Sequence, residues 1–362
     1  MIDLCLTNST LVIHFLLLLK TVFHLAGSPD SAFFERLSLV YARETLALPN
    51  YQNLFLLFSP AGKVQLTEDI DNPGPSLSLG TALDLLQQSI DQKPPVFAVS
   101  HLFCPTGLTT VRGVVEHLLK IPLLGPSAAT MEAVRSKNTA LNLARAAGVK
   151  VAPSAFLVGG TGNVPADFPF PAVVKPDRAD NSAGLSLAQN KGDLAKALGK
   201  AHAVDDHVVV EQFIPGREIR AAVIDASDGL QLLPAIEYHV SETHPMRLPE
   251  DKLDFDSKGL PISQVTESPV TNSCPALLTD DESAALQNAC RKLHQALGCR
   301  HYSLFDFRLA PDDGSPASER LFFLEAGLFW SFSPQSMISK MIAADRKDLS
   351  TTVAELWQHW QD

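Results

Sequence analysis

The chain has 362 residues, of which 46% are hydrophobic and 19% charged, so it is long enough for two or three domains and suits a packed globular protein rather than a disordered one. Its formal net charge is −11 and its basic residues form no cluster in the sequence, which argues against nucleic-acid binding. The five cysteines are irregularly spaced and form no CxxC pair, which predicts reduced thiols in a cytoplasmic protein rather than disulfides or a zinc site.

An apolar run occupies residues 11–19. It is too short for a membrane-spanning helix. A secretory signal would carry basic residues ahead of the run, whereas the first Lys or Arg of this chain is Lys20. We therefore expect no stable membrane association and a fold that begins near residue 21, with a signal or anchor as the open alternative.

Strand and helix patterns alternate over the first part of the chain. Predicted strands lie at residues 21–27, 53–58 and 94–100, and predicted helices at residues 31–46, 79–90 and 107–120. The strands are apolar runs, which is typical of strands buried on both faces. The alternation predicts a small parallel α/β domain over residues 21–124, with a loop at residues 67–78.

A second unit begins with a long helical pattern at residues 127–153, in which Ser127 is suited to cap the helix and Gly148 to end it. Predicted strands follow at residues 155–158, 171–176 and 207–214, with a helix at residues 191–203. We assign residues 125–208 to a central domain.

The remaining part, residues 209–362, predicts a sheet with helices. Predicted strands lie at residues 215–224, 231–240, 301–310 and 321–327, and predicted helices at residues 279–298, 333–349 and 351–360. The last two strands are expected to form a hairpin, and Thr279 with Glu282 forms a capping-box pattern. The polar segment 242–273 lacks periodicity, and a loop of that length inside a domain is usually functional or mobile.

The stretch VVKPDRADNSAGLS, residues 173–186, is the first candidate site. Lys175 ends an apolar strand, and a loop of small residues with Ser182 and Gly184 follows. Backbone N–H groups of such a loop, a hydroxyl and a lysine can together bind phosphate oxygens. A surface lysine beside an ordinary loop is the alternative.

The stretch VVVEQFIPGREIR, residues 208–220, is the second candidate site. An apolar strand runs into Glu211, and Glu218 follows a Pro-Gly turn. The backbone of a strand edge can bind a purine, and a nearby carboxylate can accept a hydrogen bond from a ribose hydroxyl. An ordinary hairpin with two solvated glutamates is the alternative.

Two carboxylates on otherwise apolar strands form the third candidate site. Asp306 lies in LFDFRL and Glu325 in LFFLEAG, on the two strands of the predicted hairpin. Like charges in a buried hairpin repel each other unless a cation lies between them, and carboxylate oxygens suit magnesium. Salt bridges of these carboxylates with Arg308 or Arg220 are the alternative.

In this order, the three stretches resemble the ATP-grasp fold and, in detail, its D-alanine–D-alanine ligase branch. Four segments carry the resemblance: residues 134–153, 171–186, 208–218 and 298–327. The resemblance covers the chain from about residue 21 to the C-terminus. It implies an α/β (α+β) ATP-grasp fold with an N-terminal small parallel α/β domain, a central lid domain, a C-terminal antiparallel-sheet catalytic domain, and the activity of an ATP-dependent carbon–nitrogen ligase.

The resemblance also implies roles for individual residues. The expected ATP ligands are Lys137 and Lys175 for the phosphates, Ser182, Ala183 and Gly184 in the loop that closes over them, Glu211, Gln212 and Ile214 for the adenine, and Glu218 for the ribose. Asp306 and Glu325 are expected to bind magnesium, for which manganese can substitute. The residues expected to contribute to catalysis are Lys175, Ser182, Arg220, Lys252 on a mobile loop and Ser336 near the amino-bearing substrate.

Two positions depart from this family. Where the family has a Glu-x-Asn metal motif, this chain has Glu325, Ala326 and Gly327, so an amide ligand is missing. Where the family has an arginine two residues before the metal aspartate, this chain has Leu304. That arginine helps to stabilise charge on the reacting acyl group, so its absence puts ordinary dipeptide synthesis in doubt.

Residues 25–44, 172–187, 237–240, 297–308 and 323–339 are similar to a narrower family, the ligases of mycosporine-like amino acid biosynthesis. This resemblance implies that ATP phosphorylates the ring oxygen of mycosporine-glycine and that the amino group of serine, threonine or glycine then displaces phosphate to give an imine sunscreen. It also implies a homodimer. A D-alanine–D-alanine or L-amino-acid dipeptide ligase is the alternative, followed by a non-catalytic ATP-binding sensor.

Overall fold

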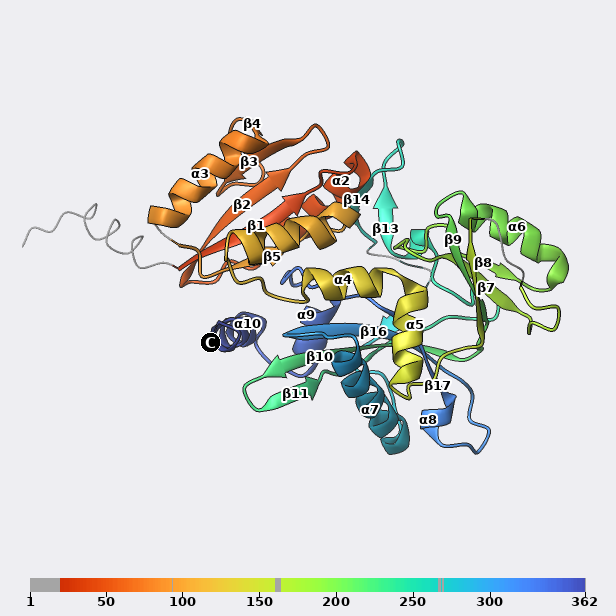
Figure 1. Ribbon diagram of the computed structural model, residues 1–362. Coiled ribbons are helices and arrows are strands. Elements are labelled where there is room, and N and C mark those ends of the chain that lie inside the picture. Colours follow the sequence, from red (N-terminus) through yellow and green to blue (C-terminus); the bar gives the residue numbers. More distant parts are fainter. Residues whose placement is uncertain (1–19, 93, 160–163, 266–267, 269, 362) are drawn as a thin grey trace, which may run out of the picture. The chain divides into compact units, whose positions relative to one another are not determined.

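The computed structural model describes residues 20–92, 94–159, 164–265, 268 and 270–361. They form two compact units (Figure 1): residues 20–124 with 331–334 and 353–361, and residues 125–330 with 335–352. The apolar run at residues 11–19 lies outside the described residues. In the described part, no helix is long and apolar enough to cross a membrane. The division into three domains stays a prediction.

The first unit is built on a five-stranded sheet with the order β4-β3-β2-β1-β5. The strands are β1 (Lys20–Gly27), β2 (Tyr51–Phe58), β3 (Lys63–Thr67), β4 (Leu77–Ser78) and β5 (Phe97–Ser100). β1, β2 and β5 are parallel, as predicted. β3 and β4 add antiparallel strands that the sequence did not indicate, because β3 alternates polar and apolar residues over only five positions and β4 has only two residues.

The helices of the first unit are α2 (Ala32–Ala42), α3 (Leu79–Gln92) and the later residues of α10 (Leu349–His359). Ser31 caps α2 by accepting a hydrogen bond from the backbone N–H of Phe34. The helix expected at residues 107–120 is confirmed, since residues 105–118 are helical throughout, with π-helical hydrogen bonding in η1 (Gly107–Val111) and η2 (Val114–Leu118). Trp357 of α10 packs edge-to-face on Phe97 and is fully buried.

The second unit begins with two helices, α4 (Ala128–Arg135) and α5 (Lys137–Ala146), where the sequence predicted one. Ser136 separates them with an extended backbone, and its side chain caps α5 by accepting a hydrogen bond from the N–H of Thr139. A serine competes with helix continuation when its hydroxyl can bind a nearby backbone N–H. The predicted cap at Ser127 and the helix end at Gly148, with φ +71°, are both confirmed.

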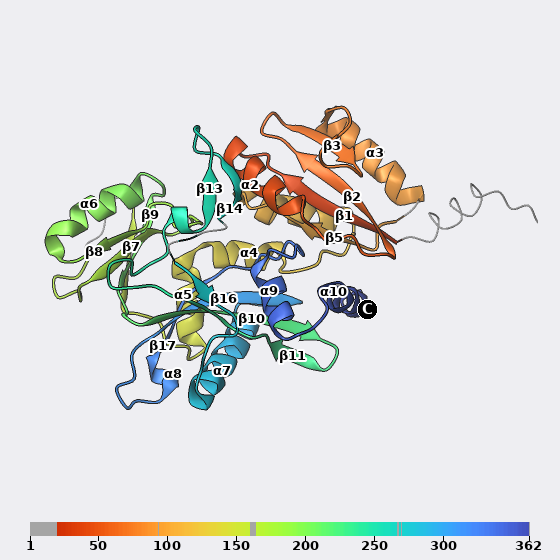
Figure 2. The same cartoon turned by 180° about the vertical axis from the view of Figure 1, so that it is seen from behind.

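A four-stranded antiparallel sheet with the order β6-β9-β7-β8 follows. Its strands are β6 (Ser154–Val158), β7 (Ala172–Pro176), β8 (Ser186–Ala188) and β9 (His207–Gln212), and helix α6 (Lys191–His202) covers one face (Figure 2). Alternation along β7 places Ala172 and Val174 in the core under α6 and leaves Lys175 on the opposite face, toward the pocket described below. The sheet therefore presents one polar face from otherwise apolar strands.

A larger six-stranded sheet has the order β15-β12-β10-β16-β17, with β11 also paired to β10. Its strands are β10 (Arg217–Ala226), β11 (Gly229–Leu232), β12 (Ile236–Tyr238), β15 (Asn272–Ser273), β16 (Tyr302–Leu309) and β17 (Leu321–Ala326). Helix α7 (Asp280–Ala296) packs against it and begins with the predicted capping box of Thr279 and Glu282. The predicted hairpin of β16 and β17 is confirmed. Helices α8 (Ala317–Arg320) and α9 (Met337–Ala344) complete the unit.

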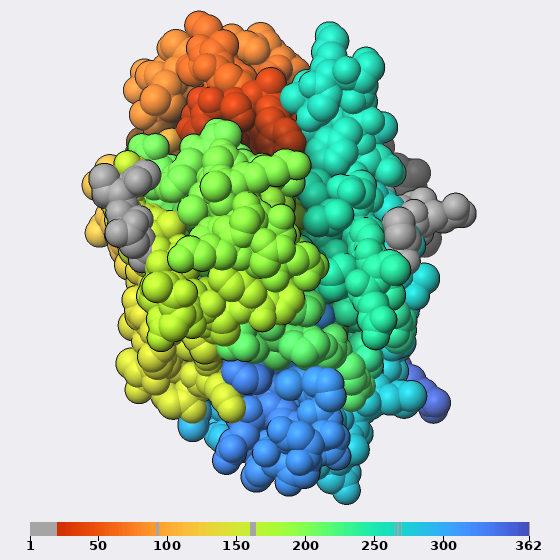
Figure 3. Space-filling model, turned by 90° about the vertical axis from the view of Figure 1, so that its right-hand side faces the viewer, coloured from red at the N-terminus to blue at the C-terminus, as the bar shows by residue number. Residues whose placement is uncertain are grey.

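The segment 242–273, expected to be a loop, holds short ordered elements: η3 (Pro249–Asp251), β13 (Leu253–Phe255), β14 (Pro261–Gln264) and β15. Figure 3 shows this segment, in teal, beside the green residues of the four-stranded sheet and its loops. The hydroxyl of Ser182 donates a hydrogen bond of 2.8 Å to the backbone oxygen of Arg247 and so links the two. The segment therefore forms part of the wall of the site.

We expect Gly216→Ala to lower the free energy of unfolding by about 2 kcal/mol or more. Gly216 turns the chain into β10 with φ +127°, and a Cβ there would lie 2.2 Å from the backbone oxygen of Leu309. Urea denaturation measures the effect. Gly199→Ala in α6 is the matched control, because open space surrounds its Cβ position and the change should be neutral or stabilise by about 0.5–1 kcal/mol. Equal effects of both variants would contradict this account.

Candidate functional site

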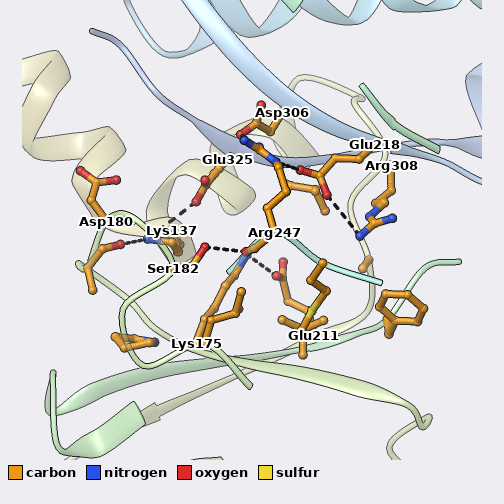
Figure 4. A pocket seen from close by; sticks show the side chains of 18 of the residues that line it. Lys137, Lys175, Asp180, Ser182, Glu211, Glu218, Arg247, Asp306, Arg308 and Glu325 are labelled. Atoms are coloured by element: carbon orange, nitrogen blue, oxygen red, sulfur yellow. Dashed lines mark hydrogen bonds and ion pairs between the residues drawn. The ribbon is translucent and has the colours of Figure 1, made fainter. Parts of the chain in front are cut away.

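One pocket of the second unit collects most of the residues that the sequence singled out (Figure 4). Its empty space, with the open solvent at its mouth included, is about 840 Å³. Its walls come from the polar face of the four-stranded sheet, the loop after β7, the start of α5, the segment 242–273 and the hairpin of β16 and β17. The predicted residues in its lining are Lys137, Lys175, Ser182, Ala183, Glu211, Gln212, Ile214, Glu218, Lys252, Asp306 and Glu325.

Lys175 and Glu211 form a buried ion pair on the sheet face. Their strands β7 and β9 are adjacent, and the Lys175 Nζ lies 2.5 Å from a carboxylate oxygen of Glu211. Burial alone lowers the pKa of Lys175, but the carboxylates of Glu211 and Glu325 outweigh it and raise that pKa above its ordinary value. Lys175 therefore stays cationic in a place where a phosphate oxygen could replace its partner.

The loop after β7 has an unusual backbone. Asn181, Ser182 and Gly184 all have positive φ angles, of 53°, 60° and 73°. A Cβ at Gly184 would lie 2.7 Å from the ring of Pro176, so the loop can fold back on the strand only with glycine there. Lys137 reaches this loop from α5 and donates a hydrogen bond of 2.5 Å to the backbone oxygen of Ala179.

Asp306 and Glu325 are register partners on β16 and β17, as the predicted hairpin requires. Arg220 on β10 binds both oxygens of Asp306, with Nε and Nη2 each at 2.6 Å, so one of the two salt bridges raised as an alternative for Asp306 is present. Burial alone raises the pKa of Asp306, but the charge of Arg220 outweighs it and lowers that pKa below its ordinary value. The Lys137 Nζ lies 3.9 Å from Glu325, and burial of Glu325 is likewise outweighed by Lys137, so its pKa is lowered.

Among the described residues, no group of three or more His, Cys, Asp or Glu side chains is placed to hold a metal. The donor set is thus the carboxylate pair, both ionised by neighbouring cations. Magnesium commonly binds through one or two carboxylates together with substrate phosphates and water, so the pair fits magnesium that arrives with a nucleotide. The described residues do not form a complete set of protein ligands for a permanently bound metal ion.

Glu218 contacts two guanidinium groups in the same pocket. Arg247 Nε donates to one of its oxygens at 2.5 Å, and Arg308 Nη2 lies 3.2 Å from the other. Arg308 also donates to the backbone oxygens of Gly216 and Pro245. A carboxylate has about four lone-pair positions, so Glu218 can still accept hydroxyl donors.

Lys252 lines the pocket from the segment 242–273 and is partly buried. Its pKa is lowered from the ordinary value to about 8, first because burial removes the ammonium from water and then because Arg247 is near. An anionic ligand in the pocket would favour the charged form of this lysine.

Three predicted residues lie outside the pocket lining. Arg220 lies behind Asp306 and binds it, Gly184 shapes the loop, and Ser336 is buried as the residue before α9, where its hydroxyl donates to Ser339 at 2.9 Å. The roles assigned to all these residues stay predictions.

Four further residues line the pocket although the sequence did not single them out: Asp180, Phe213, Met246 and Arg247. The length of the aperiodic segment 242–273 was the one signal that pointed toward Met246 and Arg247.

A family model described as D-ala D-ala ligase C-terminus matches residues 157–358. A D-alanine–D-alanine ligase of Halalkalibacterium halodurans is 32% identical over 202 residues, which cover 55% of this chain and 61% of the relative. One from Chelativorans is 30% identical over 261 residues, covering 70% of this chain and 77% of the relative. For several of the curated relatives, the match spans only about three fifths of their length.

Solved structures show the same fold. The D-Ala:D-Ser ligase VanG of Enterococcus faecalis superposes with a TM-score of 0.70 at 18% identity and covers 94% of this chain and 99% of its own. The D-alanine–D-alanine ligase of Bacillus anthracis, complexed with ATP, gives a TM-score of 0.66 at 18% identity, covering 94% of this chain and 97% of its own. The predicted mixed α/β fold of the ATP-grasp type is therefore confirmed.

We expect Lys175→Met to weaken nucleotide binding by about tenfold or more, because a charge-assisted hydrogen bond to phosphate is lost. It should also destabilise the fold by about 3–5 kcal/mol, because Glu211 is left buried without its cation. Adding Glu211→Gln should restore much of the stability and none of the nucleotide affinity. Calorimetric titration and urea denaturation measure the two quantities, and recovery of both by the double variant would contradict a direct role of Lys175.

We expect Glu325→Ala to reduce turnover by about 100-fold or more at ordinary magnesium concentrations, because one of two metal carboxylates is removed. The assay is ADP release with the substrates considered below. Glu319→Ala is the control, since Glu319 is exposed on α8 and lies outside the pocket lining. Near wild-type turnover of Glu325→Ala would refute the metal role.

Proposed function

Because the chain belongs to the D-alanine–D-alanine ligase family, we propose that it is an ATP-dependent ligase that joins an amine to a phosphate-activated carbon. The observation that carries this proposal is the convergence of two lysines and a cross-strand carboxylate pair on one pocket, Lys137 and Lys175 with Asp306 and Glu325. The presence of both lysines together with both carboxylates argues against a protein that only senses nucleotide.

The proposed reaction has two steps. The terminal phosphoryl group of ATP passes to an oxygen of the acceptor, giving ADP and an activated carbon–oxygen bond. The amine then attacks that carbon, the carbon–oxygen bond breaks, phosphate leaves with the electron pair, and the amine loses a proton. Catalysis of this type depends on position and electrostatics more than on covalent help from the protein.

Each of the pocket residues would have a separate role in this reaction. Lys137 and Lys175 would neutralise phosphate charge, and Ser182 and its neighbours would donate hydrogen bonds to phosphate oxygens. Glu218 would accept ribose hydroxyls, and the backbone near Gln212 and Ile214 would hold the adenine. Asp306 and Glu325 would hold magnesium, which supplies charge neutralisation when bound. Arg220 would keep Asp306 ionised and fixed in orientation.

For the acceptor, we propose mycosporine-glycine, with serine, threonine or glycine as the amine. The support is the similarity of the segments around Asp306 and Glu325 to that ligase family, together with Leu304 and Gly327 at positions where peptide-forming relatives carry arginine and asparagine. A vinylogous ring oxygen activated by phosphate needs no carboxylate activation, which agrees with the missing arginine.

D-Alanine–D-alanine ligation is the second candidate, and the comparisons favour it at least as strongly. The curated relatives carry that name, and the matched solved structures are D-Ala–D-Ala or D-Ala:D-Ser ligases. Both candidates share the nucleotide chemistry and differ in the acceptor and in the amine.

One assay separates the candidates. The protein is incubated with ATP, magnesium and either mycosporine-glycine plus one amino acid or D-alanine alone, and both ADP and absorbance are followed. We expect ADP and a red-shifted product only in the presence of mycosporine-glycine. ADP release with D-alanine alone would establish the second candidate and refute the first. Saturable ATP binding without turnover in any mixture would refute both.

A further inference from the structure

Three arginines surround the carboxylates Glu218 and Asp306, and their hydrogen bonds differ in kind. Arg220 uses Nε and Nη2 for a two-point contact with Asp306. Arg308 donates to two backbone oxygens as well as pairing with Glu218. Arg247 makes its hydrogen bond to Glu218 through Nε alone. Its terminal nitrogens form no hydrogen bond with the described residues, although Nη2 lies 3.5 Å from Asp306.

The surroundings of Arg247 hold its guanidinium group in one orientation. The side chain is only 8% exposed, and its Cζ lies 3.7 Å from the centroid of the Tyr238 ring, a stacking distance. Glu218 fixes Nε on one side. A planar guanidinium fixed in this way presents its outer N–H groups as a fork, which matches two oxygens of a phosphate.

The two ends of Arg247 contact two parts of the pocket that handle phosphate in the proposed function. Its guanidinium lies beside Asp306 of the carboxylate pair, with Nη2 3.5 Å from that carboxylate. Its backbone oxygen accepts a hydrogen bond from the hydroxyl of Ser182 in the loop after β7 (Figure 4). Arg247 lines the pocket, whereas Arg220 lies behind Asp306.

We propose that Arg247 binds the phosphoryl group once it has left ADP and sits on the acceptor, and so holds the activated intermediate for the amine. This inference rests on the proposed function. Arg247 would contact that phosphoryl group through its terminal N–H donors, while Lys137 and Lys175 neutralise the nucleotide phosphates. Without this contact, the intermediate would dissociate from the protein or react with water. The reaction with water would return the acceptor and free phosphate.

The test compares Arg247→Lys with Arg217→Lys. Arg217 is the matched control because it also pairs with two carboxylates, those of Glu237 and Glu282, lies next to Glu218 on β10, and is not part of the pocket lining. Lysine keeps the charge and removes the fork. A second variant, Arg247→Gln, keeps a donor for Glu218 and removes the charge, and serves if the lysine variant folds poorly.

Two quantities are measured. The first is the affinity for inorganic phosphate in the presence of saturating magnesium and ADP, by calorimetric titration. We expect Arg247→Lys to weaken it about tenfold or more, the effect of losing a charged hydrogen bond, with little change in ADP affinity. The second is the ratio of ADP to ligated product, which should rise from one in the wild type to well above one in the variant.

Unchanged phosphate affinity in Arg247→Lys, an equal loss in Arg217→Lys, or no phosphate binding to the wild-type complex with ADP would each overturn the inference. A purely structural role would lower thermal stability and ADP affinity together and leave the ADP-to-product ratio at one. Arg247-dependent phosphate binding without ligation of any tested acceptor would refute the proposed function, and with it the role of Arg247 in holding an activated intermediate. Ligation by Arg247→Lys with the ADP-to-product ratio still at one would refute the inference alone.

Discussion

Two carboxylates face each other across the last hairpin of the second unit, and the surrounding charges follow from that constraint. Asp306 on the buried strand β16 and Glu325 on the partly buried strand β17 are register partners, so their repulsion has to be balanced by cations from other elements. Arg220 comes from the neighbouring strand β10, Arg247 from the segment before β13, and Lys137 from the start of α5. Elements distant in sequence therefore converge on the hairpin.

The ion pairs of the pocket also indicate how a ligand would be received. Lys175 is paired with Glu211, Lys137 lies near Glu325, and Arg247 is bound to Glu218. A buried cation and carboxylate that satisfy each other avoid the large cost of isolated buried charge. A magnesium nucleotide brings both signs of charge, so it can exchange partners with these pairs at a small electrostatic cost. The paired charges of the pocket therefore suit a nucleotide anion that carries a bound magnesium cation.

Local sequence signals predicted the hairpin, the lysine strand and the helix caps, because each depends on neighbours in sequence. Alternation in the strand of Asp306, the Thr279 capping box and the glycine after α5 are examples. The break between α4 and α5 at Ser136 was missed because the sequence pattern is helical on both sides of it. The break depends on the single hydroxyl of Ser136, which caps α5. Arg247 was missed because its position depends on long-range contacts, with Tyr238 and with the hydroxyl of Ser182. The antiparallel strands β3 and β4 of the first unit were missed because β3 has only five residues, which alternate polar and apolar, and β4 has two.

The central claim is that the carboxylate pair, with Asp306 held ionised by Arg220, receives a divalent ion together with a nucleotide. Electron paramagnetic resonance with Mn²⁺, which substitutes for Mg²⁺ at oxygen ligands, tests this directly. We predict weak Mn²⁺ binding to the protein alone and tight binding once ADP is added. Equally tight binding without nucleotide, or no gain on adding it, would contradict the account.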